Sequence, residues 1–149
     1  MLRRYATATL SLMLAALAHG AGTADSLTGL PMPDAASGLS LGSPTKIDPA
    51  QVCKSTWTQN FYSVSGAKTS VAIAWYGAHL KGFKHLHGYG AGRSQDGFVN
   101  ADGSLWVGIT GSPAADGADT EIYAIIYATV KPGLPEKTLA GMLTQHVSC

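Results

Sequence analysis

Cysteine, charged side chains and long hydrophobic runs are all scarce in this chain of 149 residues. The longest mainly apolar run, Thr9 to Ala18, covers about ten residues and is too short to cross a bilayer roughly 30 Å thick. We therefore expect no stable membrane anchor. No HExxH or CxxC spacing is present, so no sequence-defined metal site and no metal or other cofactor is predicted.

The N-terminus has the pattern of a secretory signal peptide. Leu2-Arg3-Arg4 is a positively charged start, the apolar run follows, and small residues come next. We predict a signal peptide over residues 1–24, with cleavage after Ala18, Gly20 or Ala24. The protein is then expected in the periplasm or outside the cell.

Basic charge is too low to predict a nucleic-acid partner. Without Arg3 and Arg4, eight Lys and Arg face nine Asp and Glu, which leaves a net charge of −1. The remaining partners to consider are a protein, a small ligand or a second copy of the chain.

Cys53 and Cys149 are the only cysteines. In an exported protein the default is that such a pair forms a disulfide, which here would fix the last residue of the chain. The alternatives are that Cys149 pairs with another molecule or that Cys53 is a reactive thiol.

The pattern of hydrophobic and turn residues predicts one α+β domain over residues 48–149. It is preceded at 25–47 by a flexible linker or arm rich in Ser, Gly and Pro. We expect an antiparallel β-meander of four to five strands, packed by one central helix and a C-terminal helix, with one disulfide. The predicted helices are 48–54, 68–84 and 136–147, and the predicted strands are 57–64, 85–89, 94–99, 104–110 and 120–130.

Aromatic side chains on the sheet suggest a binding surface. Side chains along residues 120–130 and 104–110 alternate between the two faces of the sheet, and both faces receive apolar side chains. The second face is therefore either covered by chain segments or open as an interface. Our first hypothesis is a non-catalytic protein that binds a partner, a ligand or its own copy through an exposed aromatic face. Its candidate residues are His85, His87, Tyr89, Trp106, Tyr123 and Tyr127.

The histidines support an alternative, a small hydrolase or metal-dependent enzyme near His79, His85 and Asp96. His85 and His87 are two apart, so on a strand both imidazoles project from the same face. A metal would require a third ligand, and acid–base chemistry would require a carboxylate within hydrogen-bonding reach of an imidazole. We predict no nucleophilic serine or cysteine.

A positive patch is the remaining candidate. No acidic residue occurs from Pro49 to Gln95. If Lys81, Lys84 and Arg93 converge near the end of the central helix, they could hold an anion. The alternative is a solvated helix end whose lysines complement the helix dipole.

Overall fold

The computed structural model describes residues 23–149. The predicted signal peptide lies almost entirely outside this range. The elements in chain order are a 3-10 turn η1 (Ala35–Ser37), strands β1 (Thr45–Val52) and β2 (Ser55–Ser63), helix α1 (Thr69–His79), strands β3 (Lys84–Gly90), β4 (Arg93–Val99), β5 (Leu105–Gly111) and β6 (Ile122–Lys131), and helix α2 (Glu136–Thr144).

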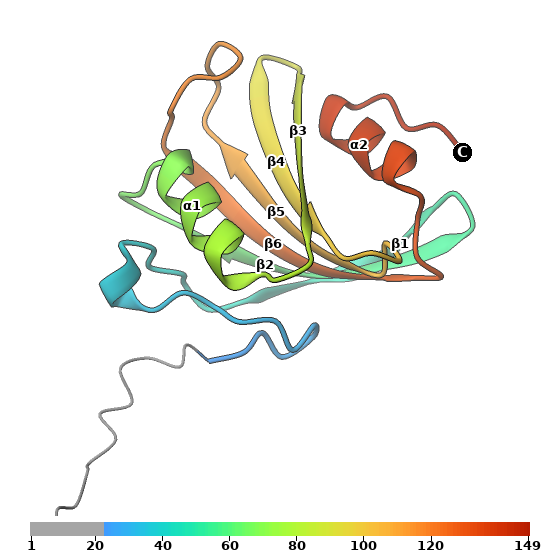
Figure 1. The fold of residues 1–149 in the computed structure, drawn as a ribbon, viewed down its shortest axis with the longest axis horizontal. Coiled ribbons are helices and arrows are strands. Elements are labelled where there is room, and N and C mark those ends of the chain that lie inside the picture. The colour runs from blue at the N-terminus through green and yellow to red at the C-terminus, as the bar shows by residue number, and fades with distance from the viewer. Residues whose placement is uncertain (1–22) are drawn as a thin grey trace, which may run out of the picture.

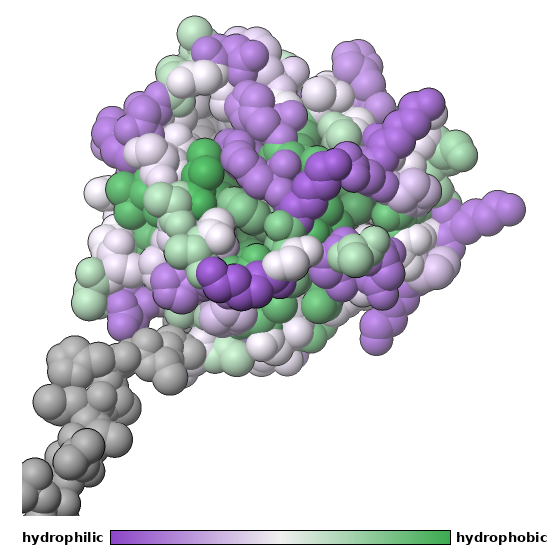
Figure 2. All heavy atoms as spheres, in the orientation of Figure 1, coloured by the Kyte–Doolittle hydropathy of each residue, from purple (hydrophilic) through white to green (hydrophobic). Residues whose placement is uncertain are grey.

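One antiparallel sheet has the strand order β1-β2-β6-β5-β4-β3. Helices α1 and α2 lie on opposite sides of it (Figure 1). The predicted α+β class, meander, two helices and disulfide are confirmed, with six strands instead of four to five. On the face seen in Figure 2, hydrophobic and hydrophilic side chains are interspersed, and hydrophilic side chains also cross the middle.

The additional strand is β1, and the prediction of a helix over 48–54 is wrong. Residues Thr45–Val52 pair with β2, and the register shifts between Ile47 and Ala50, around Asp48 and Pro49. Proline cannot donate to a ladder, but a bulge in an edge strand tolerates it. A capping Asp followed by Pro resembles a helix start locally, yet pairing with β2 decides the conformation.

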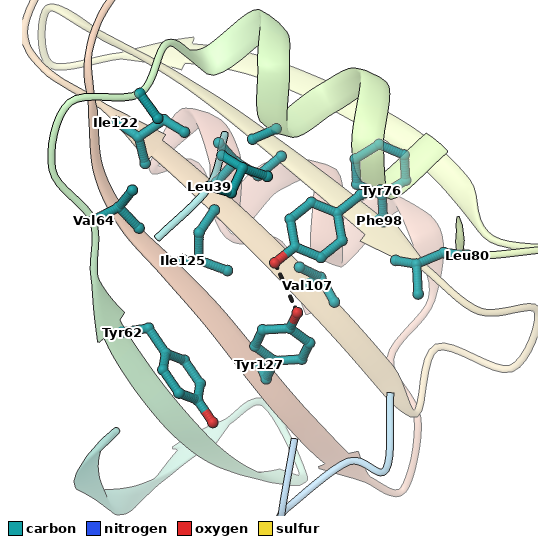
Figure 3. Close-up of a cluster of buried hydrophobic side chains, with 13 residues drawn as sticks. Leu39, Tyr62, Val64, Tyr76, Leu80, Phe98, Val107, Ile122, Ile125 and Tyr127 are labelled. Carbon is teal, nitrogen blue, oxygen red and sulfur yellow. Dashed lines mark hydrogen bonds between the residues drawn. The ribbon is translucent and has the colours of Figure 1, made fainter. Parts of the chain in front are cut away.

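The core on the α1 side is built around two tyrosines. The hydroxyl groups of Tyr76 and Tyr127 lie 2.7 Å apart (Figure 3). Tyr127 also donates to the Pro31 carbonyl at 2.9 Å. Burial raises the pKa of both phenols, so both remain neutral hydroxyl groups. The surrounding buried side chains include Leu39, Tyr62, Val64, Leu80, Phe98, Val107, Ile122 and Ile125.

Residues 25–47 contribute side chains to this core. Leu39 is fully buried, and Leu41 forms a bridge with Val64. Asp25 is also buried and accepts hydrogen bonds from Tyr62 at 2.6 Å and Asn60 at 2.9 Å. The segment predicted as a linker or arm therefore lies across the α1 side of the sheet.

The core on the α2 side depends on glycines in β3. A Cβ atom on Gly88 would lie 2.6 Å from Leu143 Cβ, and one on Gly90 would lie 2.7 Å from the Thr144 carbonyl oxygen. The missing side chains let α2 approach the backbone of this edge strand closely. Trp57, Leu86, Trp106, Val130, Leu139 and Leu143 complete this core.

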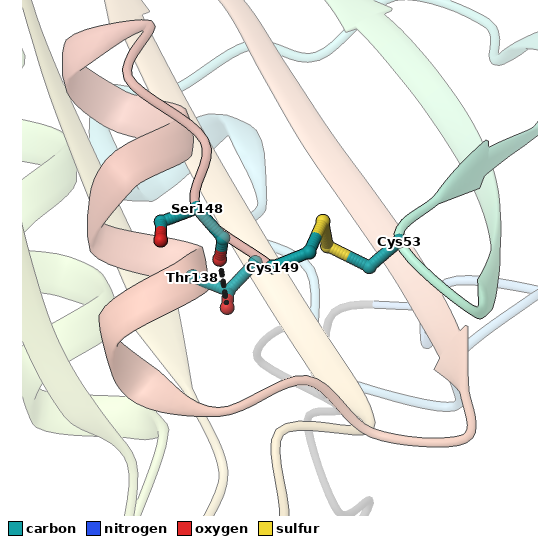
Figure 4. The surroundings of a disulfide bond; sticks show 4 residues. All are labelled: Cys53, Thr138, Ser148 and Cys149. Carbon is teal, nitrogen blue, oxygen red and sulfur yellow. Dashed lines mark hydrogen bonds between the residues drawn. A yellow bond between two sulfur atoms is a disulfide. The ribbon is translucent and has the colours of Figure 1, made fainter.

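The Cys53–Cys149 disulfide joins the β1–β2 turn to the C-terminus (Figure 4). The Cα atoms lie 5.6 Å apart, and 96 positions separate the two residues. Nearby, Thr138 Oγ1 donates to the Ser148 carbonyl at 2.8 Å. The terminal segment is therefore bound to both α2 and β1–β2. Among residues 23–149, no helix combines the length and apolar character needed to cross a membrane.

Candidate functional site

A buried carboxylate joins two histidines on the α1 side of β3 and β4. Asp96 Oδ1 lies 2.8 Å from His85 Nε2 and 3.0 Å from His87 Nδ1. The strand register causes this convergence, because His87 pairs directly with Asp96 and His85 pairs with Phe98, on whose ring it stacks. Asp96 is only 4% exposed, so both histidines lie above an anionic group that water barely reaches.

His87 has a second carboxylate partner. Its Nε2 lies 2.8 Å from Asp116 Oδ1, in the loop between β5 and β6. The hydrogen bond to Asp116 raises the pKa of His87, and Asp96 adds to the effect, while partial burial opposes it. An imidazolium donates from both nitrogens, whereas a neutral ring donates from only one. The protonated form of His87 therefore binds β4 and this loop at once.

These residues line a cavity of about 340 Å³, which we call the imidazole pocket. One wall is the start of α1, where Asp119 accepts hydrogen bonds from the backbone N–H of Ser70 at 3.0 Å and from Thr69 Oγ1 at 3.2 Å. The Ser70 N–H bond is the main reason that the pKa of Asp119 is lowered. The pocket is lined by Thr69, Ser70, Ile73, His85, His87, Ser94, Asp96, Gly117, Ala118 and Asp119.

Two polar groups in this pocket have free hydrogen-bonding capacity. Ser94 Oγ is buried and has no partner among the described residues. Both histidines contact Oδ1 of Asp96, and no group within the same residues donates a hydrogen bond to its other oxygen, Oδ2. Ser94 and Asp96 lie two apart on β4 and share its face. The pocket therefore presents a carboxylate oxygen that a ligand could bind, and the unpartnered Ser94 hydroxyl is buried beside it.

His79 does not join this cluster, which corrects one part of the enzyme hypothesis. Its ring stacks on Trp75 with centroids 4.0 Å apart, and its Nδ1 lies 2.7 Å from the Trp75 carbonyl oxygen. The His85–Asp96 contact does meet the required hydrogen-bonding distance. Within residues 23–149, no three His, Cys, Asp or Glu side chains are placed to share a metal ion.

The expected common aromatic face is not formed. Tyr127 pairs with Val107 and is completely buried on the α1 side, whereas Trp106 pairs with Ala128 and is 4% exposed on the α2 side. The register shift after Thr110 leaves Tyr123 outside the pairing and 59% exposed. A one-residue bulge reverses the alternation, so Tyr123 is separated from Tyr127. Of the other candidates, Tyr89 is 40% exposed on β3.

The expected anion patch is not assembled either. Lys84 begins β3 and binds Glu136 at 2.7 Å, whereas Arg93 begins β4 at the opposite end of this hairpin. Arg93 lies over the Tyr123 ring, 5.9 Å from its centroid. Lys81 follows α1 and is exposed. Antiparallel pairing thus separates cations that are close in sequence.

Several pocket residues were missed because they come from distant segments. Thr69 and Ser70 resemble ordinary helix-capping residues, and Asp116 and Asp119 resemble turn residues. Only the tertiary structure brings them to the histidines. A further pattern, Gly38-Leu39-Ser40-Leu41-Gly42, matches the letters GxSxG but lies in the segment before β1, without the strand-to-helix turn that exposes a nucleophile.

Comparison with known proteins found no matching family model, curated protein or solved structure.

Proposed function

We propose that this protein is an exported binding protein that holds a small organic cation in the imidazole pocket. The observation that carries the proposal is the Asp96 carboxylate, which is buried at the pocket yet receives no hydrogen bond at Oδ2 from any described residue. Such an oxygen suits an N–H donor of a ligand. The N-terminal pattern and the disulfide support export.

Charge favours a cation. Asp96 and Asp119 line the pocket and Asp116 borders it through His87, so three carboxylates surround two imidazoles. When all three are ionised, protonation of both histidines still leaves an excess negative charge. The volume of about 340 Å³ falls in the range of small-molecule pockets. The binding class expected from the sequence is retained, with the pocket in place of the aromatic face.

NMR titration of the imidazole resonances tests this function. We would add 1,4-diaminobutane, sorbitol and succinate separately to the folded protein. The diamine should move the His85 and His87 signals with saturation, and succinate should not. Asp96→Asn should weaken diamine binding at least tenfold, whereas Asp48→Asn, on the distant edge strand β1, should not change it. Absence of a saturable response to the diamine, or equal affinity in Asp96→Asn, would refute the proposal.

Hydrolysis is the second candidate because of one specific feature. Asp96 holds His85 at Nε2, while His85 Nδ1 has no partner among the described residues, so this nitrogen could accept a proton from water. We would measure p-nitrophenyl acetate hydrolysis in the wild type, His85→Gln and His79→Gln. A loss confined to His85→Gln would favour catalysis. Equal losses would indicate ordinary surface imidazoles and remove this candidate.

A further inference from the structure

A second groove lies on the opposite side of the sheet, beside α2. It has a volume of about 170 Å³. Met142 and Leu143 of α2 form one side, Trp57 and Gln59 of β2 form another, and Trp106 lies between them. Asp96 lines both this groove and the imidazole pocket, but its carboxylate contacts His85 and His87 on the α1 side of the sheet.

Two glycines hold Trp106 flat on the sheet. A Cβ atom on Gly97 would lie 2.0 Å from Trp106 Cη2, and one on Gly108 would lie 2.9 Å from Trp106 Nε1. Gly97 and Gly108 are paired in neighbouring strands, so the indole covers a bare strip of backbone. The indole nitrogen consequently lies over Gly108, which lines the groove.

The Trp106 indole N–H is an unused donor. The residue as a whole is 4% exposed, and no hydrogen bond joins Nε1 to another described side chain. Among the described residues, Ser94 Oγ is the only buried side-chain nitrogen or oxygen atom without a partner, so Trp106 Nε1 still reaches solvent and is available to a ligand in the groove. By contrast, Trp57 Nε1 donates to Gln59 Oε1 at 2.7 Å, which leaves the Gln59 amide N–H groups available. Two neutral donors, from Trp106 and Gln59, therefore border one groove.

Aromatic rings continue along the sheet from this groove. Phe61 pairs with Ile126, which lines the groove, and packs edge-on against the exposed Tyr123 ring with centroids 6.2 Å apart. The polar side chains that line the groove on this face are Gln59, Gln95 and Thr110, all uncharged. An occupant should therefore be neutral, with one apolar surface and several hydroxyl or amide groups.

We propose that this groove, extended by Phe61 and Tyr123, binds a neutral saccharide. A sugar ring places C–H groups on its flat surface, which suits contact with aromatic rings, and hydroxyl groups at its edge, which can accept from Trp106 Nε1 and the Gln59 amide. An acyl chain fits this groove less well, because it would leave three neutral hydrogen-bonding side chains and an indole N–H without partners, and this would cost free energy. Gln59, Gln95 and Thr110 are uncharged, which complements an uncharged sugar, and at the aromatic extension the Arg93 guanidinium lies over the Tyr123 ring.

Indole N–H resonances test this site directly, because the chain has three tryptophans and Trp75 lies on the other side of the sheet. The probes are cellotriose, tri-N-acetylchitotriose, benzamide and octanoate. At least one of the two saccharides should shift the Trp106 resonance with saturation, and benzamide and octanoate should not. Trp106→Phe should weaken saccharide binding at least tenfold, and the matched Trp75→Phe variant should not.

Gln59→Leu provides a second variant if Trp106→Phe does not fold, and it should also weaken saccharide binding at least tenfold. Failure of both saccharides to shift the Trp106 signal would overturn the proposal. A response only to benzamide or octanoate would assign the groove to a planar amide or an acyl chain instead. Equal weakening by Trp75→Phe and Trp106→Phe would attribute the effect to general loss of structure and would equally refute it.

Discussion

Two glycine-to-alanine substitutions should change stability in opposite directions. In Gly97→Ala, the new methyl group would meet the Trp106 ring at 2.0, 2.3 and 2.8 Å. Overpacking of this kind costs about 1–3 kcal/mol, and displacing a buried indole can cost about 3–5 kcal/mol. We expect Gly97→Ala to lower the free energy of unfolding by about 2–4 kcal/mol.

Gly77 provides the matched substitution. It is exposed within α1, and the nearest atom to an added Cβ would be Phe98 Cε1 at 4.0 Å. Alanine is favoured over glycine in a helix by about 1 kcal/mol. Gly77→Ala should therefore raise the free energy of unfolding by about 0.5–1 kcal/mol.

Urea denaturation followed by circular dichroism measures both effects, with the m-value as a check on two-state behaviour. Gly97→Ala should also shift tryptophan fluorescence toward a more exposed indole. Replacing Trp106 by Leu in the Gly97→Ala background should recover part of the loss, because the smaller side chain leaves room for the methyl group. Destabilisation of Gly97→Ala by less than about 1 kcal/mol would refute the proposed steric contact with Trp106.

Three further perturbations test other contacts. The double variant Cys53→Ser, Cys149→Ser opens a loop of 96 positions and should lower the free energy of unfolding, measured in urea, by up to about 4–5 kcal/mol. Equal stability of this variant and the unreduced wild type would contradict a stabilising role of the disulfide. The pKa of His87 is raised above 6.5 in the folded protein, so its contribution to the free energy of unfolding should be fully present below the unfolded pKa and should decline as pH rises through the folded pKa. His87→Gln should remove this pH-dependent contribution when stability is measured against pH. A profile unchanged by His87→Gln would be inconsistent with the two carboxylate contacts. Burial alone would raise the pKa of Asp25, but hydrogen bonds from Tyr62, Asn60 and Thr28 outweigh it and lower the pKa. The contribution of Asp25 to the free energy of unfolding should therefore be present above the unfolded pKa of 3.8 and decline as pH falls through the lower folded pKa. Asp25→Ala should cost about 1–3 kcal/mol and increase proteolysis within residues 25–44, and protection equal to the wild type would show that the Asp25 contacts do not hold this segment.

Local sequence patterns were sufficient for most of the fold. Alternation and turn residues indicated the strands over 94–99, 104–110 and 120–130, and the spacing of apolar residues indicated both helices. The even cysteine count indicated the disulfide. These features succeed because hydrophobic periodicity and turn conformations depend on neighbouring residues.

The candidate site was only partly accessible from the sequence. The spacing of His85 and His87 predicts a shared strand face, and Asp96 was named with His85 in the enzyme hypothesis. The approach of Asp116 and Asp119 depends on how the loop between β5 and β6 folds over α1 and β3. No local pattern contains that information.

The sequence alone determined the types of the elements from β2 to α2 and the cysteine pair, but not the type of β1. Tertiary structure decided which faces meet. A single bulge in β6, at Tyr123, separates Tyr123 from Tyr127, and strand register places Trp106 and Tyr127 on opposite sides of the sheet. The physical reason is that side chains alternate along a strand, so a shift of one residue moves each following side chain to the other face.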